Sequence, residues 1–157
     1  MPSHDDFMRQ AIALSRQGME DNRGGPFGAV VVQDGRVIAE GWNQVTSTND
    51  PTAHAEIVAI RRACIAAGSR ELRGAVLYTS CEPCPMCLAA AYWARLDAVF
   101  YANARDDAAA IGFDDQWIYD EVPKPIEARS LAMRRLLAAE ALEVFQAWTA
   151  KQDRTPY

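Results

Sequence analysis

The sequence has no long apolar run, and none of its apolar stretches approaches the roughly 20 residues that a membrane-spanning helix needs. Its start, MPSHDDFMRQ, has neither the basic beginning nor the apolar core of a secretory signal, so we expect a cytoplasmic protein. Basic runs are no longer than a pair, and the net charge is −5. Because a phosphate backbone demands several Lys or Arg contacts, extended nucleic acid is a disfavoured partner, although a local patch stays open.

Cysteine and histidine are also scarce. Three of the four cysteines lie in the segment TSCEPCPMC, residues 79–87, and the only imidazoles are those of His4 and His54. A disulfide framework is not expected for cysteines crowded into one segment of a chain without a secretory signal. The cysteine pattern therefore indicates metal binding or catalysis.

The 157 residues fit one domain in which helices and strands alternate without repeats. We expect a helix over 5–20, then a hairpin of strands over 27–33 and 36–42 turned by Asp34-Gly35. The next helix is expected to have Asp50 as its N-cap, Pro51 as its first residue and Gly68 at its end.

The second half of the chain continues the alternation. AVLYTS and DAVFYAN are expected to be buried strands on either side of a helix that opens at Pro83. Strand, helix and strand in succession predict parallel neighbours in an α/β fold. After Ala104 we expect a short helix and loop, and then mostly helix over 125–150 with an edge strand near 130–136.

The four cysteines differ in their expected positions. Because Pro83 disfavours helical geometry at the preceding residue, Cys81 is expected at the end of a strand. Cys84 and Cys87 are three residues apart, so one helical turn brings both sulfurs to one ion. Cys64 is about 15 Å along a helix from His54 and is expected to be a small buried apolar residue.

A pair of thiolates needs further ligands, and His54 in AHAE is the available imidazole. If the strands beside the two helices are parallel neighbours, both helix N-termini lie at one sheet edge, where they favour thiolates. His54, Cys84 and Cys87 suit zinc and leave its fourth position open. Cys81 as a fourth ligand would instead make a closed structural site. Glu56 favours the catalytic interpretation, because it could reach a bound water without being a ligand.

HAE and PCPMC match the H-x-E and P-C-x-x-C signature of the zinc-dependent base deaminases. Beyond these motifs, residues 25–157 resemble the small bacterial guanine deaminases, through GGPFGAVVV, NDPTAHAE, LYTSCEPCPMC, YWAR, GFDD, FQAW and the terminal Tyr. The resemblance implies a three-layer α/β/α cytidine-deaminase-like fold with a mixed central sheet and one zinc per subunit. It also implies a homodimer in which the segments from about residue 125 to 157 are exchanged between subunits.

The resemblance implies hydrolysis of guanine to xanthine and ammonia by a zinc-activated water, with Glu56 as the proton carrier. Asp115 in GFDD would engage the N–H groups of the purine and is counted with Glu56 among the catalytic candidates; Asp114 could instead cap a turn. Phe27 and Trp93 resemble walls for a flat ring, Asn43 a base-binding residue, and Tyr157 a residue that closes the partner's pocket. The expected substrate contacts are Phe27, Asn43, His54, Ala55, Trp93, Asp115 and Tyr157.

Three alternatives stay open at this point. A tRNA adenosine deaminase shares the signature, but the acidic balance and GFDD weigh against it. A deaminase for another small base, a nucleoside or an aminated triazine would need only a few different pocket residues. A zinc-stabilised binding module would use Cys81 to close the site and would not need Glu56.

Overall fold

A four-stranded sheet with strand order β2-β1-β3-β4 lies at the centre of residues 1–119 in this computed structural model, which describes residues 1–157. Strand β1 pairs antiparallel with both β2 and β3, whereas β3 pairs parallel with β4. The sheet is therefore mixed, as expected. Its strands are β1 (Gly28–Gln33), β2 (Arg36–Trp42), β3 (Ala75–Cys81) and β4 (Ala98–Asn103).

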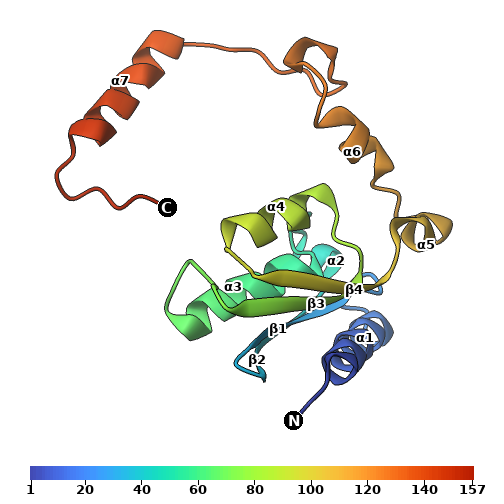
Figure 1. Cartoon of the computed structure of the whole chain (residues 1–157). Coiled ribbons are helices and arrows are strands. Elements are labelled where there is room, and N and C mark those ends of the chain that lie inside the picture. Colours follow the sequence, from blue (N-terminus) through green and yellow to red (C-terminus); the bar gives the residue numbers. More distant parts are fainter. The chain divides into compact units, whose positions relative to one another are not determined.

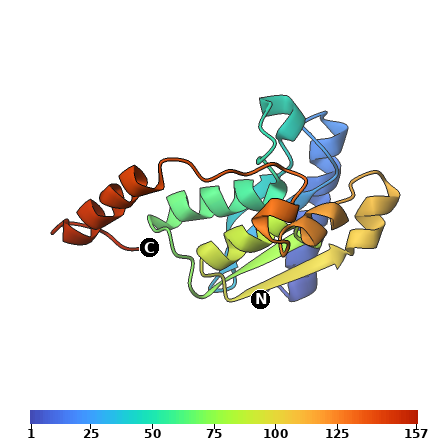
Figure 2. The same ribbon diagram turned by 90° about the horizontal axis from the view of Figure 1, so that it is seen from above.

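Helices cover both faces of this sheet. Helix α1 (His4–Glu20) packs on one face, while α3 (Ala55–Ala67) and α4 (Pro85–Trp93) lie on the other (Figure 1). Seen from above, α3 and α4 run side by side over the sheet (Figure 2). The remaining helices of residues 1–119 are α2 (Val45–Thr48), α5 (Arg105–Ala110) and the first part of α6 (Gln116–Glu121). The three-layer α/β/α prediction is confirmed.

The alternation of side chains along the central strands explains why both faces need cover. On β1, Ala29 and Val31 belong to the core cluster shared with α3, whereas Val30 and Val32 belong to the cluster that contains Phe7 and Ala11 of α1. Successive residues of a strand point to opposite faces, so a strand that is apolar throughout is buried on both sides. The run GAVVVQ therefore specifies a central strand between two helical layers.

Two local signals act as the sequence predicted, at the hairpin turn and at Gly68, and a capping box at Ser3 adds to them. Asp34 and Gly35 both adopt positive φ at the hairpin turn, at 50° and 72°. Gly68 ends α3 in the left-handed region. Ser3 caps α1 by accepting a hydrogen bond from the Asp6 amide, and the Asp6 carboxylate accepts one from the Ser3 amide in return.

Both helix starts at the sheet edge were predicted too early. Asp50 does not cap α3, because its carboxylate accepts hydrogen bonds from the backbone and side chain of Thr52 and closes a local turn. The helix begins at Ala55, with His54 as its N-cap residue. Helix α4 likewise begins at Pro85 rather than Pro83. Both proline positions tolerate a helix start, so sequence alone did not separate them.

Two strand predictions also need correction. Strand β4 was expected to be buried, but it is the sheet edge and its last four residues are exposed in the single chain. No strand forms over 130–136, a segment that has no regular secondary structure.

Residues 120–157 form a second compact unit, which contains the 3₁₀ helix η1 (Ile126–Ala128) and α7 (Ala138–Ala150). This unit has no buried residue, and large apolar side chains of α7 are exposed. None of the helices in the chain is both long and apolar enough to cross a bilayer.

Gly41 provides a test of the packing between β2 and α3. A Cβ atom at this position would lie 2.2 Å from the Ala55 carbonyl oxygen and 2.6 Å from the Ala59 amide nitrogen. We expect Gly41→Ala to lower the free energy of unfolding by about 3 kcal/mol, because the helix must move away from the strand. Urea denaturation measures this loss.

Gly68→Ala is the matched control. Nothing lies within 4 Å of a Cβ atom at Gly68, so its only cost is the left-handed conformation, at about 1–2 kcal/mol. A loss for Gly41→Ala no larger than that for Gly68→Ala would contradict the close packing of β2 on α3.

Candidate metal centre

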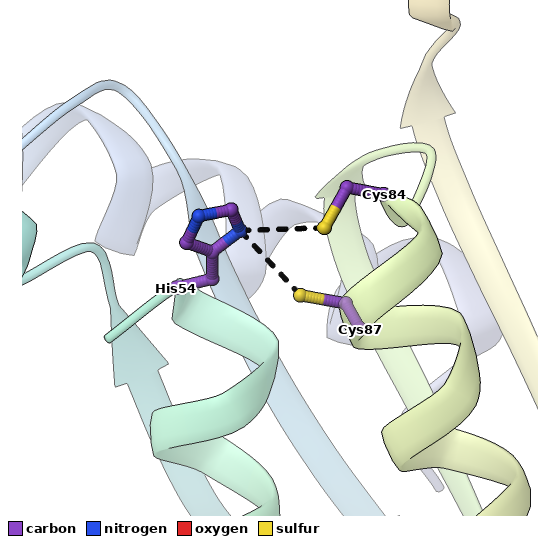
Figure 3. A group of neighbouring side chains, drawn as sticks. All are labelled: His54, Cys84 and Cys87. Atoms are coloured by element: carbon purple, nitrogen blue, oxygen red, sulfur yellow. Dashed lines mark hydrogen bonds between the residues drawn. The ribbon is translucent and has the colours of Figure 1, made fainter. Parts of the chain in front are cut away.

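His54, Cys84 and Cys87 form a cluster whose ligand atoms all lie within 4.8 Å of one another. The Nδ1 atom of His54 is 3.5 Å from the Sγ atom of Cys84 and 3.5 Å from that of Cys87 (Figure 3). His54 and Cys84 are half-buried and Cys87 is fully buried. The three residues that were predicted as ligands therefore meet in one place.

Two of these residues occupy equivalent positions in their helices. His54 is the N-cap residue of α3 and Cys84 is the N-cap residue of α4, both with extended backbone geometry. Neither side chain caps its own helix, so the imidazole and the thiol stay available to a ligand. The N-terminal end of each helix dipole favours negative charge on the thiols.

The sheet topology brings the two N-caps together. Strands β2 and β3 are both antiparallel to β1, so they run in the same direction with β1 between them. Both strands therefore end on the same side of the sheet. From there the chain continues into α3, after the short α2, and into α4. The strands before the two helices are therefore parallel but are not neighbours, a detail that the sequence did not predict.

The donor set fits zinc. One imidazole nitrogen and two thiol sulfurs are typical zinc donors, and three protein ligands are the usual number in catalytic sites. Cys81 is not part of the cluster: it lies at the end of β3, where its Sγ atom is 3.9 Å from the Ala104 carbonyl oxygen. Burial raises the pKa of the Cys81 thiol to about 11.

Hydrogen bonds within the cluster set the charges of its members. Hydrogen bonding by Cys87, and then by His54, lowers the pKa of Cys84 to about 4, against the opposing effect of burial. The pKa of Cys87 is raised, chiefly because its thiol donates to Cys84 and also because it is buried. The hydrogen bond to Cys84 likewise raises the pKa of His54. These hydrogen bonds therefore favour the thiolate form of Cys84 over that of Cys87.

Glu56 lies beside the cluster but outside it. Its side chain is 6% exposed, and its Oε2 atom is 3.5 Å from the Cys87 sulfur. The hydroxyl of Thr79 on β3 donates to the other carboxylate oxygen at 3.1 Å. Burial raises the pKa of Glu56, so this carboxyl group holds a proton more readily than an exposed one.

A cavity of about 470 Å³ opens over these residues. Its walls include Phe27, Asn43 and Asp115 among the predicted substrate contacts, together with His54 and Glu56. Ala55 is fully buried as the first residue of α3, and Trp93 ends α4. Ala55 and Trp93 do not line this cavity, and Tyr157 belongs to the separate unit of residues 120–157.

Two residues near the centre were missed by sequence reasoning. Phe113 lines the cavity and meets Phe27 edge to face, with ring centroids 4.9 Å apart. Thr79 holds Glu56, as described above. Thr79 could have been noticed as one of two adjacent polar residues, with Ser80, in the strand AVLYTSC, and Phe113 as an aromatic residue next to the acidic pair in GFDD.

A three-layer α/β/α fold with one histidine and two cysteines at converging helix N-termini is compatible with a zinc-binding protein in which these three residues would hold the ion. Residues 1–103 match the family model of the cytidine and deoxycytidylate deaminase zinc-binding region. The chain belongs to this family of zinc-binding deaminases.

Individual relatives give a finer comparison. The chain is 52% identical to the guanine deaminase of Bacillus subtilis, over 99% of both chains. The X-ray structure of guanine deaminase from B. subtilis superimposes with a TM-score of 0.97, again over 99% of both chains. A tRNA-specific adenosine deaminase of Agrobacterium fabrum is 46% identical, over 71% of this chain and 72% of its own.

The cysteines can be separated by their metal content. We expect Cys81→Ser to retain about one zinc per chain, because its sulfur lies outside the ligand cluster. Cys84→Ser and Cys87→Ser should lose most of the metal, since each removes one of three ligands. Zinc measured per chain by elemental analysis checks this, and equal loss in all three variants would indicate a closed four-ligand site.

Proposed function

We propose that this protein hydrolyses guanine to xanthine and ammonia, with His54, Cys84 and Cys87 holding zinc and Glu56 carrying protons. The observation that carries the proposal is a buried carboxyl group that faces the ligand cluster at the floor of a cavity. Guanine is favoured because the similarity to a guanine deaminase covers 99% of this chain, while that to a tRNA-specific adenosine deaminase covers 71%.

Bound zinc would supply a water molecule whose pKa is lowered from about 15.7 toward 7. Glu56 would take a proton from the attacking water and pass protons to the amino group, so that a carbon–oxygen bond forms at carbon 2 of guanine and the carbon–nitrogen bond breaks to release ammonia. Its raised pKa suits a group that must both accept and return a proton. Thr79 holds one carboxylate oxygen, which leaves the other directed toward the cluster. Positioned proton transfer contributes about 10²- to 10⁴-fold to such rates.

Asn43 is suited to bind the base as a hydrogen-bond donor. Its Oδ1 atom accepts hydrogen bonds from the backbone amides of Gly25 at 3.3 Å and Val45 at 3.1 Å. These two bonds fix the amide orientation, so the group that Asn43 can offer to a ligand is its NH₂. Guanine carries acceptors at its carbonyl oxygen and ring nitrogens, which an amide donor can bind.

Asp115 is suited to the opposite edge of the base. It lines the cavity just before α6, and its carboxylate can accept hydrogen bonds from the N–H groups of guanine. Phe27 and Phe113 supply an apolar wall for the ring, and the backbone of Ala55 lies between His54 and Glu56. Donor, acceptor and aromatic wall together suit a purine with both carbonyl and amino groups.

We further propose that residues 1–157 act as one deaminase domain in a homodimer whose C-terminal segments, from about residue 125, are exchanged between subunits. Large apolar side chains of α7 are exposed in the single chain, namely Leu142, Val144, Phe145 and Trp148. Exposed apolar surface of this kind indicates a covered interface. In this arrangement Tyr157 covers the partner's pocket, and Trp93 is a candidate contact to the base. The cytoplasmic location stays a prediction.

An ammonia-release assay across substrate classes tests the function. We expect the highest kcat/KM with guanine, and much lower values with cytosine, guanosine, aminated triazines and adenosine in tRNA. Faster release from any of these, with guanine inert, would assign the chain to that substrate instead. Absence of release from all of them by zinc-loaded protein would favour a zinc-stabilised binding module.

Glu56→Gln tests the proton carrier. The amide has the same shape as the carboxyl group but cannot accept and return a proton, so we expect kcat to fall by several orders of magnitude. Zinc content and the melting temperature should stay close to those of the unchanged protein. Glu71→Gln is the control, because Glu71 forms an ion pair with Arg73 outside the cavity. Near-normal turnover of Glu56→Gln would remove Glu56 from the mechanism.

Deletion of residues 153–157 tests the exchanged tail. We expect nearly unchanged zinc content and a guanine turnover at least tenfold lower, because the tail no longer excludes water from the partner's pocket. Mixing the truncated chain with full-length Glu56→Gln should restore activity, since the truncated subunit keeps Glu56 and receives a tail from its partner. No recovery in verified mixed dimers would mean that the tail does not act across subunits.

A further inference from the structure

The segment that carries Asp115 is not held by a hydrophobic core. Residues 112–115, between α5 and α6, contribute Gly112, Phe113, Asp114 and Asp115 to the cavity wall. Each of the two flanking helices is six residues long, and neither contains a buried residue. Phe113 of this recognition loop, as we call residues 111–115, packs edge to face on Phe27, but the flanking helices add no buried residue. Polar contacts of these helices therefore help to set the distance of the loop from the metal ligands.

A first tie joins the start of α5 to the loop that carries Cys84. Arg105 is the first residue of α5, and its Nε atom is 3.2 Å from Oε1 of Glu82. The backbone amide of Arg105 donates to the other carboxylate oxygen of Glu82 at 3.1 Å. Arg105 thus binds both carboxylate oxygens of Glu82, and Glu82 lies two positions before Cys84. Such two-point contacts hold geometry better than a single ion pair.

A second tie joins α6 to the same loop. The hydroxyl of Tyr119 donates to the backbone carbonyl of Pro83 at 2.7 Å. The Tyr119 amide lies 3.4 Å from the Asp115 carbonyl oxygen, one helical turn back, so an anchored Tyr119 also fixes Asp115. The guanidinium of Arg105 stacks over the Tyr119 ring at 4.2 Å from its centroid, which links the two ties.

We propose that Arg105 and Tyr119 are positioning residues that fix the recognition loop against the loop of Glu82, Pro83 and Cys84. They touch neither the ligand cluster nor the reacting atoms, and they act by setting the distance between Asp115 and the metal centre. This inference rests on the proposed function, in which Asp115 binds the base. It gives a function to Arg105 in α5 and Tyr119 in α6, which both lie outside the two deaminase motifs.

Partial burial makes these contacts more than a surface ion pair. Exposed pairs contribute little to stability, because water and salt screen them. The side chains of Glu82 and Arg105 are 27% and 37% exposed, whereas the Arg73 side chain in the Arg73–Glu71 pair is 68% exposed. The pair of Arg105 is also joined by a backbone hydrogen bond and an aromatic ring. Arg73–Glu71 is therefore a fitting control for an isolated surface pair.

Tyr119→Phe and Arg105→Gln test the proposal in the zinc-loaded, full-length protein. Tyr119→Phe keeps the ring beneath Arg105 and removes only the hydrogen bond to Pro83. We expect KM for guanine to rise about three- to tenfold, the effect of one lost hydrogen bond, with kcat changed less than twofold. Arg105→Gln should raise KM at least as much, and Arg105→Lys should recover part of the loss. Zinc per chain should stay near one.

Two further measurements separate positioning from general stability. Hypoxanthine lacks the 2-amino group and cannot be deaminated, so its dissociation constant reports binding alone; we expect it to rise in parallel with KM. The double variant should lose less than the product of the single losses, because both residues hold one loop. Arg73→Gln should leave KM, kcat and hypoxanthine binding unchanged.

The outcomes distinguish this inference from the proposed function. If the unchanged protein releases no ammonia from guanine, the proposed function fails. If it does, but Tyr119→Phe and Arg105→Gln keep the original KM and hypoxanthine affinity, the positioning role alone is wrong. Loss of zinc or of the folded state in Tyr119→Phe would also overturn it, because the residue would then be structural.

Discussion

Two helices must begin at the same edge of the sheet for the three ligand atoms to meet, and the direction of β2 and β3 imposes this. Strand β1 lies antiparallel between them, so the chain leaves both strands on one side. Each following helix has a ligand as its N-cap residue, His54 for α3 and Cys84 for α4. Gly41 lets α3 approach β2 closely enough to bring His54 to the edge. The centre is therefore a product of the topology.

Burial and hydrogen bonding then shift the pKa values of the side chains at this edge in opposite directions. Hydrogen bonds from Cys87 and His54 lower the pKa of Cys84 to about 4, whereas burial raises the pKa of Glu56. Both groups line one cavity together with the imidazole of His54. A centre that must both bind a cation and move protons needs this separation, since a uniformly ionised site would bind the metal but would not return a proton.

The segment of the proposed substrate contact Asp115 is less firmly packed than the loops of the proposed metal ligands. The ligand-bearing loops follow strands of the central sheet, but the loop with Phe113 and Asp115 lies between two short helices without buried residues. Polar contacts from Arg105 and Tyr119 to the loop of residues 82–84 provide the connection. A family in which the metal motif is retained and the base differs could change its specificity in this segment without disturbing the core.

The sequence by itself determined the elements whose signals are local. Asp34-Gly35 specified the hairpin, Gly68 the end of α3, and the uninterrupted apolar run of β1 a strand buried on both faces. The spacing of Cys84 and Cys87 predicted that one helical turn brings their sulfurs together, and the short motif of His54 and Glu56 completed the candidate centre. The seven predicted substrate contacts depended on the resemblance, and two of them, Ala55 and Trp93, do not line the cavity.

Where two local signals competed, only the tertiary structure decided the outcome. Asp50 could cap a helix or close a turn, and its contacts with Thr52 chose the turn. Pro83 and Pro85 could each begin a helix, and the helix begins at Pro85. The contacts of Thr79 with Glu56 and of Arg105 with Glu82 each join residues 23 positions apart. Local periodicity carries no information about such pairs, because their distance is set by how the strands order and the helices pack.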